Sequence, residues 1–117
     1  MTLAAQSSSP VQAPPDWLLQ LSSQADEIAA FCNSHGEFLA ALKNAIELVE
    51  RNFPPQRKIE IRLEQDPEIR GEWLVIAVAV TGDVDAVLND YDRCMLAWVS
   101  SLTPEALRFL CLTYDFV

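Results

Sequence analysis

Residues 58–80, KIEIRLEQDPEIRGEWLVIAVAV, decide the fold of this chain. Apolar and charged residues alternate strictly over residues 58–64, and a period of two predicts a strand with one dry face and one wet face. Residues 73–80 are an unbroken apolar run of strand length, which predicts a buried central strand. The intervening stretch QDPEIRG is rich in turn-forming residues. We therefore expect an antiparallel hairpin, with its charged side on a partly open face of the sheet.

The segment before this hairpin begins with a helical pattern at residues 17–32. Its apolar residues follow one another at near-helical spacing, and Asp16 is a predicted N-cap because its carboxylate can accept a backbone N–H. Two consecutive serines, Ser22 and Ser23, are expected to divide this helix into two short pieces.

A stronger helical pattern covers residues 38–53, where apolar residues recur at steps of three and four. Ser34 and Glu37 have the spacing of a capping box, in which the serine hydroxyl and the glutamate carboxylate each accept a backbone N–H. Pro54 and Pro55 are predicted to end the helix because neither can donate a backbone hydrogen bond.

A third long helix is predicted after the hairpin, where Thr81-Gly82-Asp83 ends the second strand and provides an N-cap. Its predicted buried face follows the same helical spacing. That face consists of Val84, Val87, Leu88, Tyr91, Met95 and Trp98.

The C-terminal segment combines a short helix and a strand. Thr103 is a predicted N-cap followed by Pro104 at the first helical position, and residues 110–116 alternate as a strand does. The order α-α-β-β-α-(short α)-β predicts an α+β fold, a two-layer sandwich in which a three-stranded sheet carries its helices on one face. We expect residues 16–117 to form one domain, preceded by a disordered and uncharged tail at residues 1–15.

The composition is that of a globular protein of 117 residues, with 50% hydrophobic and 21% charged residues. Eight basic and 17 acidic residues leave a net charge of −9. We therefore expect no nucleic-acid partner, because nucleic-acid affinity comes mainly from basic residues at phosphates, and no membrane, because anionic lipid would repel the chain. The charge itself either keeps the protein in solution or favours a basic protein partner.

Three cysteines, Cys32, Cys94 and Cys111, are widely spaced and each has apolar neighbours. Their odd number argues against a disulfide framework, and the presence of a single histidine argues against a zinc site with four ligands. We expect buried or half-buried free thiols, a reducing cytoplasmic location and no bound cofactor.

No catalytic or metal-binding constellation emerges from the sequence. His35 is the only histidine, and it is expected to be an exposed residue in the first turn of a helix. The pairs Asp83-x-Asp85 and Asp90-x-Asp92 lie on one helix, where residues two apart point to different sides. We therefore predict a protein without catalytic or metal-ligating residues.

The most concentrated negative charge lies at the hairpin turn, where four carboxylates fall within nine residues. Turns held by a rigid hairpin often carry recognition. The predicted partner-binding residues are Glu64, Asp66, Glu68 and Glu72, and a merely hydrated turn is the alternative.

Two resemblances add to these inferences. The element order from residue 38 onward resembles that of the bacterial type of KH domain, which binds RNA through a GxxG loop; the matching residues 100–103 are SSLT and contain no glycine. The segments IRLEQDPEI and EWLVIAVAVTGDVDAVLNDYDR, within residues 59–117, look like small uncharacterised bacterial α+β proteins. That resemblance implies a bacterial source and an α+β fold, and no activity.

The sequence therefore favours a small acidic interaction module without catalysis. It could form a homodimer, because an unpaired edge at the last strand can pair with another chain. It could equally bind a basic partner, as antitoxins and immunity proteins do. The alternative is a small-molecule or divalent-metal binding protein with weak hydrolase activity at Asp83, Asp90 or Glu72.

Overall fold

The structure is a computed structural model that describes residues 14–36, 38–53, 57–68 and 71–116. The predicted disordered tail lies outside the described residues except for Pro14 and Pro15. Glu37 of the predicted capping box and the helix-ending Pro54 and Pro55 also lie outside them.

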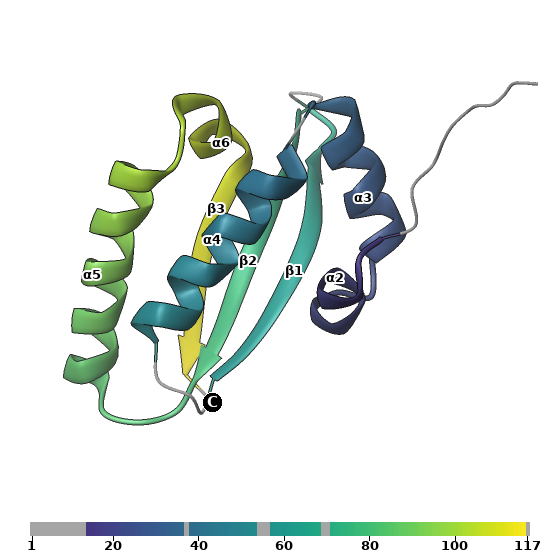
Figure 1. Cartoon of the computed structure of the whole chain (residues 1–117). Coiled ribbons are helices and arrows are strands. Elements are labelled where there is room, and N and C mark those ends of the chain that lie inside the picture. Colours follow the sequence, from purple (N-terminus) through teal and green to yellow (C-terminus); the bar gives the residue numbers. More distant parts are fainter. Residues whose placement is uncertain (1–13, 37, 54–56, 69–70, 117) are drawn as a thin grey trace, which may run out of the picture.

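The predicted α+β fold is confirmed, with the expected order of elements (Figure 1). Two short helices and one long helix precede the hairpin, and a long helix, a short helix and a strand follow it. The elements are α2 (Asp16–Leu21), α3 (Ala25–Ser34), α4 (Phe38–Asn52), β1 (Arg57–Asp66), β2 (Gly71–Val80), α5 (Val84–Ser101), α6 (Pro104–Phe109) and β3 (Leu110–Phe116).

The sheet has the strand order β1-β2-β3. β1 and β2 pair antiparallel, as the hairpin predicts, and β2 and β3 pair parallel. Ile61, Ile76 and Leu112 are aligned across the three strands, so their side chains share one face. β2 is therefore the central strand, and β3 is an edge strand.

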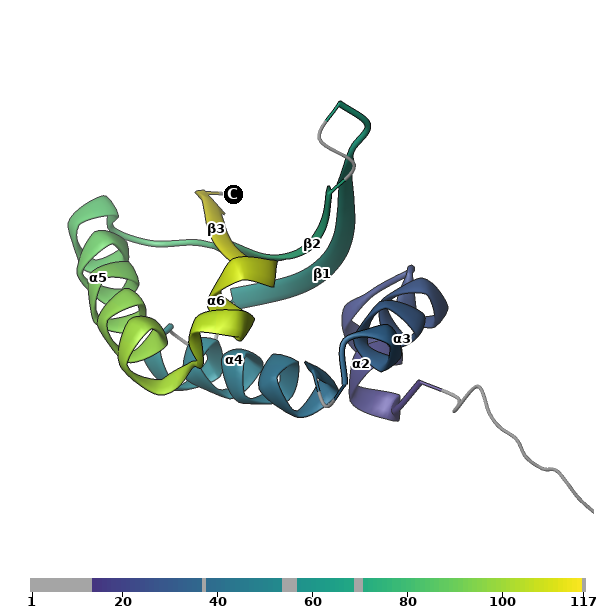
Figure 2. The ribbon, with the colours of Figure 1, turned by 90° about the horizontal axis from the view of Figure 1, so that it is seen from above.

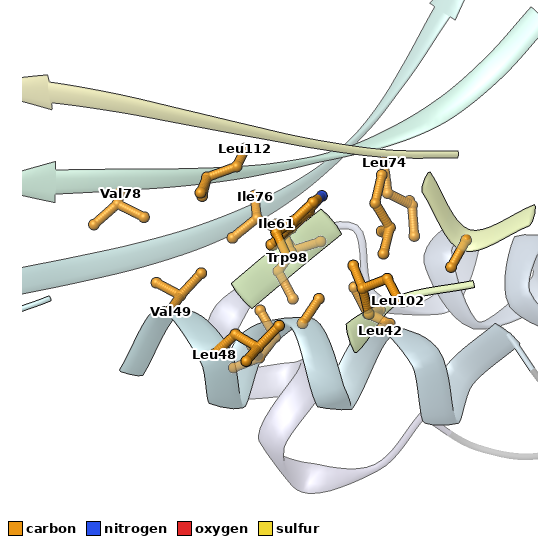
Figure 3. Packing of buried hydrophobic residues seen from close by; sticks show 14 of the residues in the cluster. Leu42, Leu48, Val49, Ile61, Leu74, Ile76, Val78, Trp98, Leu102 and Leu112 are labelled. Carbon is orange, nitrogen blue, oxygen red and sulfur yellow. The ribbon is translucent and has the colours of Figure 1, made fainter. Parts of the chain in front are cut away.

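The core lies between the sheet and the helices on this face. α4 crosses below the sheet, α2 and α3 lie toward β1, and α5 lies toward β3 (Figure 2). Leu42 and Val49 of α4 point toward Leu74 and Val78 of β2, and Trp98 of α5 lies between them (Figure 3). All of these side chains are almost fully buried, and burial of this kind is the main stabilising contribution to a small domain.

The junction between α2 and α3 is tied to β1. The predicted break at the two serines is confirmed, and the Ser22 hydroxyl donates to the Ile61 carbonyl oxygen at 2.5 Å and accepts from the backbone N–H of Gln24 at 3.0 Å. The predicted N-cap at Asp16 is wrong by one residue: α2 already includes Asp16, and Pro15 is the capping residue with no side-chain hydrogen bond.

Both predicted caps in the C-terminal half are confirmed. The Asp83 carboxylate accepts the backbone N–H of Ala86 at 3.1 Å, at the start of α5. The Thr103 hydroxyl accepts the backbone N–H of Ala106 at 3.1 Å, and Pro104 occupies the first turn of α6.

The predicted buried face of α5 is wrong at Val84 and Leu88, which are exposed. α5 packs mainly against α4 and lies toward the β3 edge of the sheet (Figure 2). The residues of α5 that are almost fully buried are Val87, Cys94 and Trp98. A side of α5 that the pattern assigned to the core is therefore left facing solvent.

Candidate functional site

The four carboxylates predicted to bind a partner lie at the end of the β1–β2 hairpin but do not share one face. Glu64 pairs with Trp73, and Glu72 pairs with Gln65. Because side chains alternate along a strand, Glu64 faces the open side of the sheet and Glu72 faces the helix side. The hairpin therefore spreads its charge over both faces.

Among the described residues, the hydrogen bonds and the ion pair of these side chains also stay within the hairpin. Asp66 Oδ1 accepts the backbone N–H of Glu68 at 2.9 Å, and Gln65 Nε2 donates to Glu72 Oε2 at 3.2 Å. Arg62 Nε lies 3.6 Å from Glu64 Oε2. These contacts describe a turn that is satisfied locally, and whether it binds a partner stays a prediction.

The residues considered for metal or hydrolase chemistry are not brought together. Asp83 caps α5, and Asp90 forms an ion pair with Arg93 on the same helix. Glu72 lies near the start of β2, eight residues before the strand ends, which is about 26 Å along the strand. Within the described parts of the chain, no group of three or more His, Cys, Asp or Glu side chains could hold a metal ion.

His35 is not the exposed first-turn residue that was predicted. It follows the last residue of α3 and is half-buried, with its ring 4.3 Å from that of Phe31 and 4.7 Å from that of Phe109. Nδ1 lies 2.8 Å from the Phe31 carbonyl oxygen. The predicted role of Ser34 also changes, because Ser34 ends α3 and its hydroxyl donates to the same carbonyl at 2.8 Å. Both side chains therefore contact a backbone carbonyl oxygen in the last turn of α3.

The three cysteines are free, and they divide into two environments. Cys32 and Cys94 are buried, as predicted, and burial raises the pKa of each thiol to about 11. The prediction is wrong for Cys111, which is exposed. Cys111 pairs with Val75 on β2 and lies on the open face of the sheet, because the alternation of β3 points Leu110 and Leu112 into the core.

Exposed apolar side chains gather on α5 and the end of β3. Among the described residues, six large hydrophobic side chains are exposed, and five of them belong to these two elements. Their exposed fractions are 53% for Val84, 39% for Leu88, 72% for Leu96, 62% for Val99 and 44% for Phe116, while Leu19 of α2 is the sixth. Single exposed apolar residues are common, whereas a concentration on one side of a molecule marks an interaction surface.

On α5, three of these side chains and two half-buried neighbours form a strip along the helix axis, and Leu96 lies outside it. Val84, Leu88, Tyr91, Met95 and Val99 are spaced by three or four residues. Because each helical residue advances about 100°, they fall within a sector of about 80° that adjoins the buried face. The 18 residues of α5 make the helix about 27 Å long, so the strip offers a straight and extended contact.

Aromatic rings continue this strip onto β3. The ring centroids of Tyr91 and Tyr114 are 4.7 Å apart, and those of Tyr114 and Phe116 are 6.0 Å apart. Partial burial raises the pKa of Tyr91, and nearby thiol and phenol groups add to this effect. We define the α5–β3 surface as Val84, Leu88, Tyr91, Met95, Leu96, Val99, Tyr114 and Phe116.

Negative charge borders this surface. Asp85 and Asp92 lie beside the strip, between it and Leu96, and both are exposed. The only basic residue of α5 is Arg93, and β3 has none. Arg93 pairs with Asp90, on the opposite side of the helix from the strip, so no basic side chain of α5 or β3 neutralises the border.

The open face of the sheet carries a shallow hollow of about 310 Å³. Ala77 and Ala79 form its floor, and Lys58, Arg62 and Asp115 stand at its sides. Arg62 is held between Glu60 and Glu64, at 3.9 Å and 3.6 Å. The charges around the hollow are mixed in sign and do not converge on one point.

Sequence reasoning missed Leu96 and Val99 and assigned Val84 and Leu88 to the core. The sequence did contain one indication that some of these side chains would be exposed. Apolar residues occur over more of the circumference of α5 than a single buried face needs.

Comparison with protein-family models, with curated proteins and with solved structures finds no match to this chain. None of the helices in the described residues has both the length and the apolar character that crossing a membrane requires.

Proposed function

We propose that the protein is a small acidic module without catalysis of its own, which acts by binding a protein chain through the α5–β3 surface. The occupant is either a second copy or a basic partner of the kind that antitoxins and immunity proteins bind. The observation that carries this proposal is the concentration of five exposed large apolar side chains on α5 and β3.

The position of β3 supports the same conclusion. β3 is an edge strand, so half of its backbone N–H and C=O groups point away from β2 and are free to pair with another chain. In addition, α5 lies beside this edge of the sheet (Figures 1 and 2). A partner at this edge would therefore contact both the strand and the apolar strip of the helix.

The three free thiols support an assignment to a reducing cytoplasm.

The test is site-specific photo-crosslinking in cells that naturally express the protein. The photoreactive residue p-benzoylphenylalanine replaces Leu96 in one variant and Leu19 in a control, since both positions are exposed and apolar. We expect a crosslinked species from position 96 and none from position 19. Equal crosslinking from the two positions, or none from position 96, would overturn the proposal. Sedimentation velocity of the purified chain then separates self-association from binding of a different protein.

A further inference from the structure

We infer that the α5–β3 surface receives an amphipathic helix of another protein, whose basic side chains lie beside its apolar stripe. This inference rests on the proposed function, and it specifies the chemistry of the partner. Three properties of the surface lead to it, namely its shape, its charge and the like charges that a second copy would bring.

The shape of the surface favours a helix. Val84, Leu88, Met95 and Val99 form a straight strip along α5 rather than a rounded pocket. An apolar strip with this spacing is matched by a second helix that carries anchors at three- and four-residue steps. The rings of Tyr114 and Phe116 extend the contact beyond α5 on one side.

The charge of the surface favours a basic helix. Asp85 and Asp92 lie two turns apart on one border of the strip. Neither forms an ion pair with a described residue, whereas Asp90 does. Lysine or arginine residues that flank the apolar stripe of a docked helix would therefore meet two carboxylates with no competing cation on α5.

The same charges disfavour a second copy. An antiparallel two-fold arrangement of α5 against α5 would place the Asp85 and Asp92 borders of two chains near one another. Each chain also carries a net charge of −9. Like charges opposed at an interface suppress association, so the strip is suited to a partner of opposite sign.

The test uses two synthetic helical peptides of about 18 residues, long enough to match the length of α5. Both carry leucine at three- and four-residue steps; one has lysine at the flanking positions and the other has glutamate. Binding to the full-length protein is measured by isothermal titration calorimetry at low and at physiological salt. We expect the lysine peptide to bind at least about tenfold more tightly than the glutamate peptide, with an affinity that falls as salt rises.

Two variants and two matched controls locate the binding. Leu88→Ser/Val99→Ser removes apolar contacts from the strip, and Asp85→Lys/Asp92→Lys reverses its border. Leu19→Ser and Asp26→Lys/Glu47→Lys make comparable changes at exposed positions elsewhere. We expect each test variant to weaken the lysine peptide at least about tenfold and each control to change its affinity by less than about twofold. Circular dichroism verifies that every variant is folded.

The inference is overturned if the two peptides bind equally, if neither binds, or if test and control variants lose affinity alike. It is also overturned if the free protein forms a dimer that Leu88→Ser/Val99→Ser dissociates, because the second copy is then the occupant. In that last case the proposed function stands, since crosslinking from position 96 is still expected.

Discussion

α4 and α5 are the two long helices of the molecule, and they use their apolar residues in opposite ways. α4 has 15 residues and buries Phe38, Leu42, Ala45, Ile46, Leu48 and Val49. α5 is longer, with 18 residues, yet it buries only Val87, Cys94 and Trp98 to the same degree. Both helices are amphipathic, but the apolar residues of α5 are spread over more of its circumference, and the two helices also lie in different environments.

The difference arises from their positions relative to the sheet. α4 crosses the face that carries Ile61, Ile76 and Val78, whereas α5 lies toward the β3 edge (Figure 2). A helix over the face of a sheet is covered along its whole apolar side, and a helix beside an edge is covered on one flank only. We conclude that α4 mainly stabilises the fold and that α5 leaves part of its apolar surface exposed.

The largest expected effect is at α4. Leu42 is fully buried, so Leu42→Ala removes apolar contacts and leaves a cavity. We expect a loss of about 2–5 kcal/mol in the free energy of unfolding, measured by urea denaturation. A loss below about 1 kcal/mol would show that α4 is not the better-packed helix and would remove the contrast with α5.

The second prediction concerns alkaline pH and compares the buried thiol of α5 with the buried thiol of α3. The pKa of Cys94 is about 11 in the folded protein, against 9.0 for a free thiol. The unfolded chain therefore releases this proton first, and the contribution to stability is present below pH 9.0 and lost as the pH rises toward 11. We expect Cys94 to account for a loss on the order of 2 kcal/mol over this range.

The measurement is urea denaturation at about pH 8 and at about pH 10.5, for the natural chain and for Cys94→Ala. The difference in pH dependence between the two proteins isolates the contribution of this thiol from that of every other group that titrates in the same pH range. Cys32→Ala serves as the comparison away from α5, because burial raises the pKa of Cys32 to the same value. An unchanged pH dependence in Cys94→Ala would show that the thiol is accessible in solution.

A smaller effect is expected at the start of α5, where the Asp83 carboxylate accepts the N–H of Ala86. Asp83→Ala should reduce stability by about 1 kcal/mol, the usual loss for a removed N-cap. Because α5 has few buried side chains, we expect its backbone amides to exchange with deuterium faster than those of α4. Asp83→Ala should increase this difference in exchange rate. Equal protection of α4 and α5 would contradict the comparison.

The smallest effect on stability is expected at Leu96. Its side chain is 72% exposed, so Leu96→Ser should change the free energy of unfolding by less than about 0.5 kcal/mol. Leu19→Ser on α2 is the matched control and should behave alike. Binding of the lysine peptide should weaken only for Leu96→Ser. A large loss of stability at Leu96 would mean that this side chain supports the fold.

Much of the fold could be predicted from local patterns. The alternation of residues 58–64, the apolar run of residues 73–80 and the caps at Asp83 and Thr103 all reappear in the structure. These features depend on neighbours along the chain, because periodicity and capping are local properties. The capping box failed as a prediction at Ser34 because the α3 helix continues to that residue.

The candidate site could not be predicted in the same way. The acidic hairpin was the prominent feature of the sequence, and strand pairing distributes Glu64 and Glu72 over two faces. Leu88 was assigned to the core because its spacing fits the buried stripe. Its exposure follows from the lateral position of α5, and no local pattern encodes that position.

The sequence by itself determined which segments are helices and strands, because hydrophobic periodicity, helix caps and turn residues act over a few neighbouring positions. Only the tertiary structure decided that β3 is an edge strand and that α5 stands beside this edge with Leu96 and Val99 exposed. Both depend on how distant segments share the limited area of one small sheet. A three-stranded sheet has too little face to cover two long helices completely, and the helix beside its edge keeps part of its apolar side exposed.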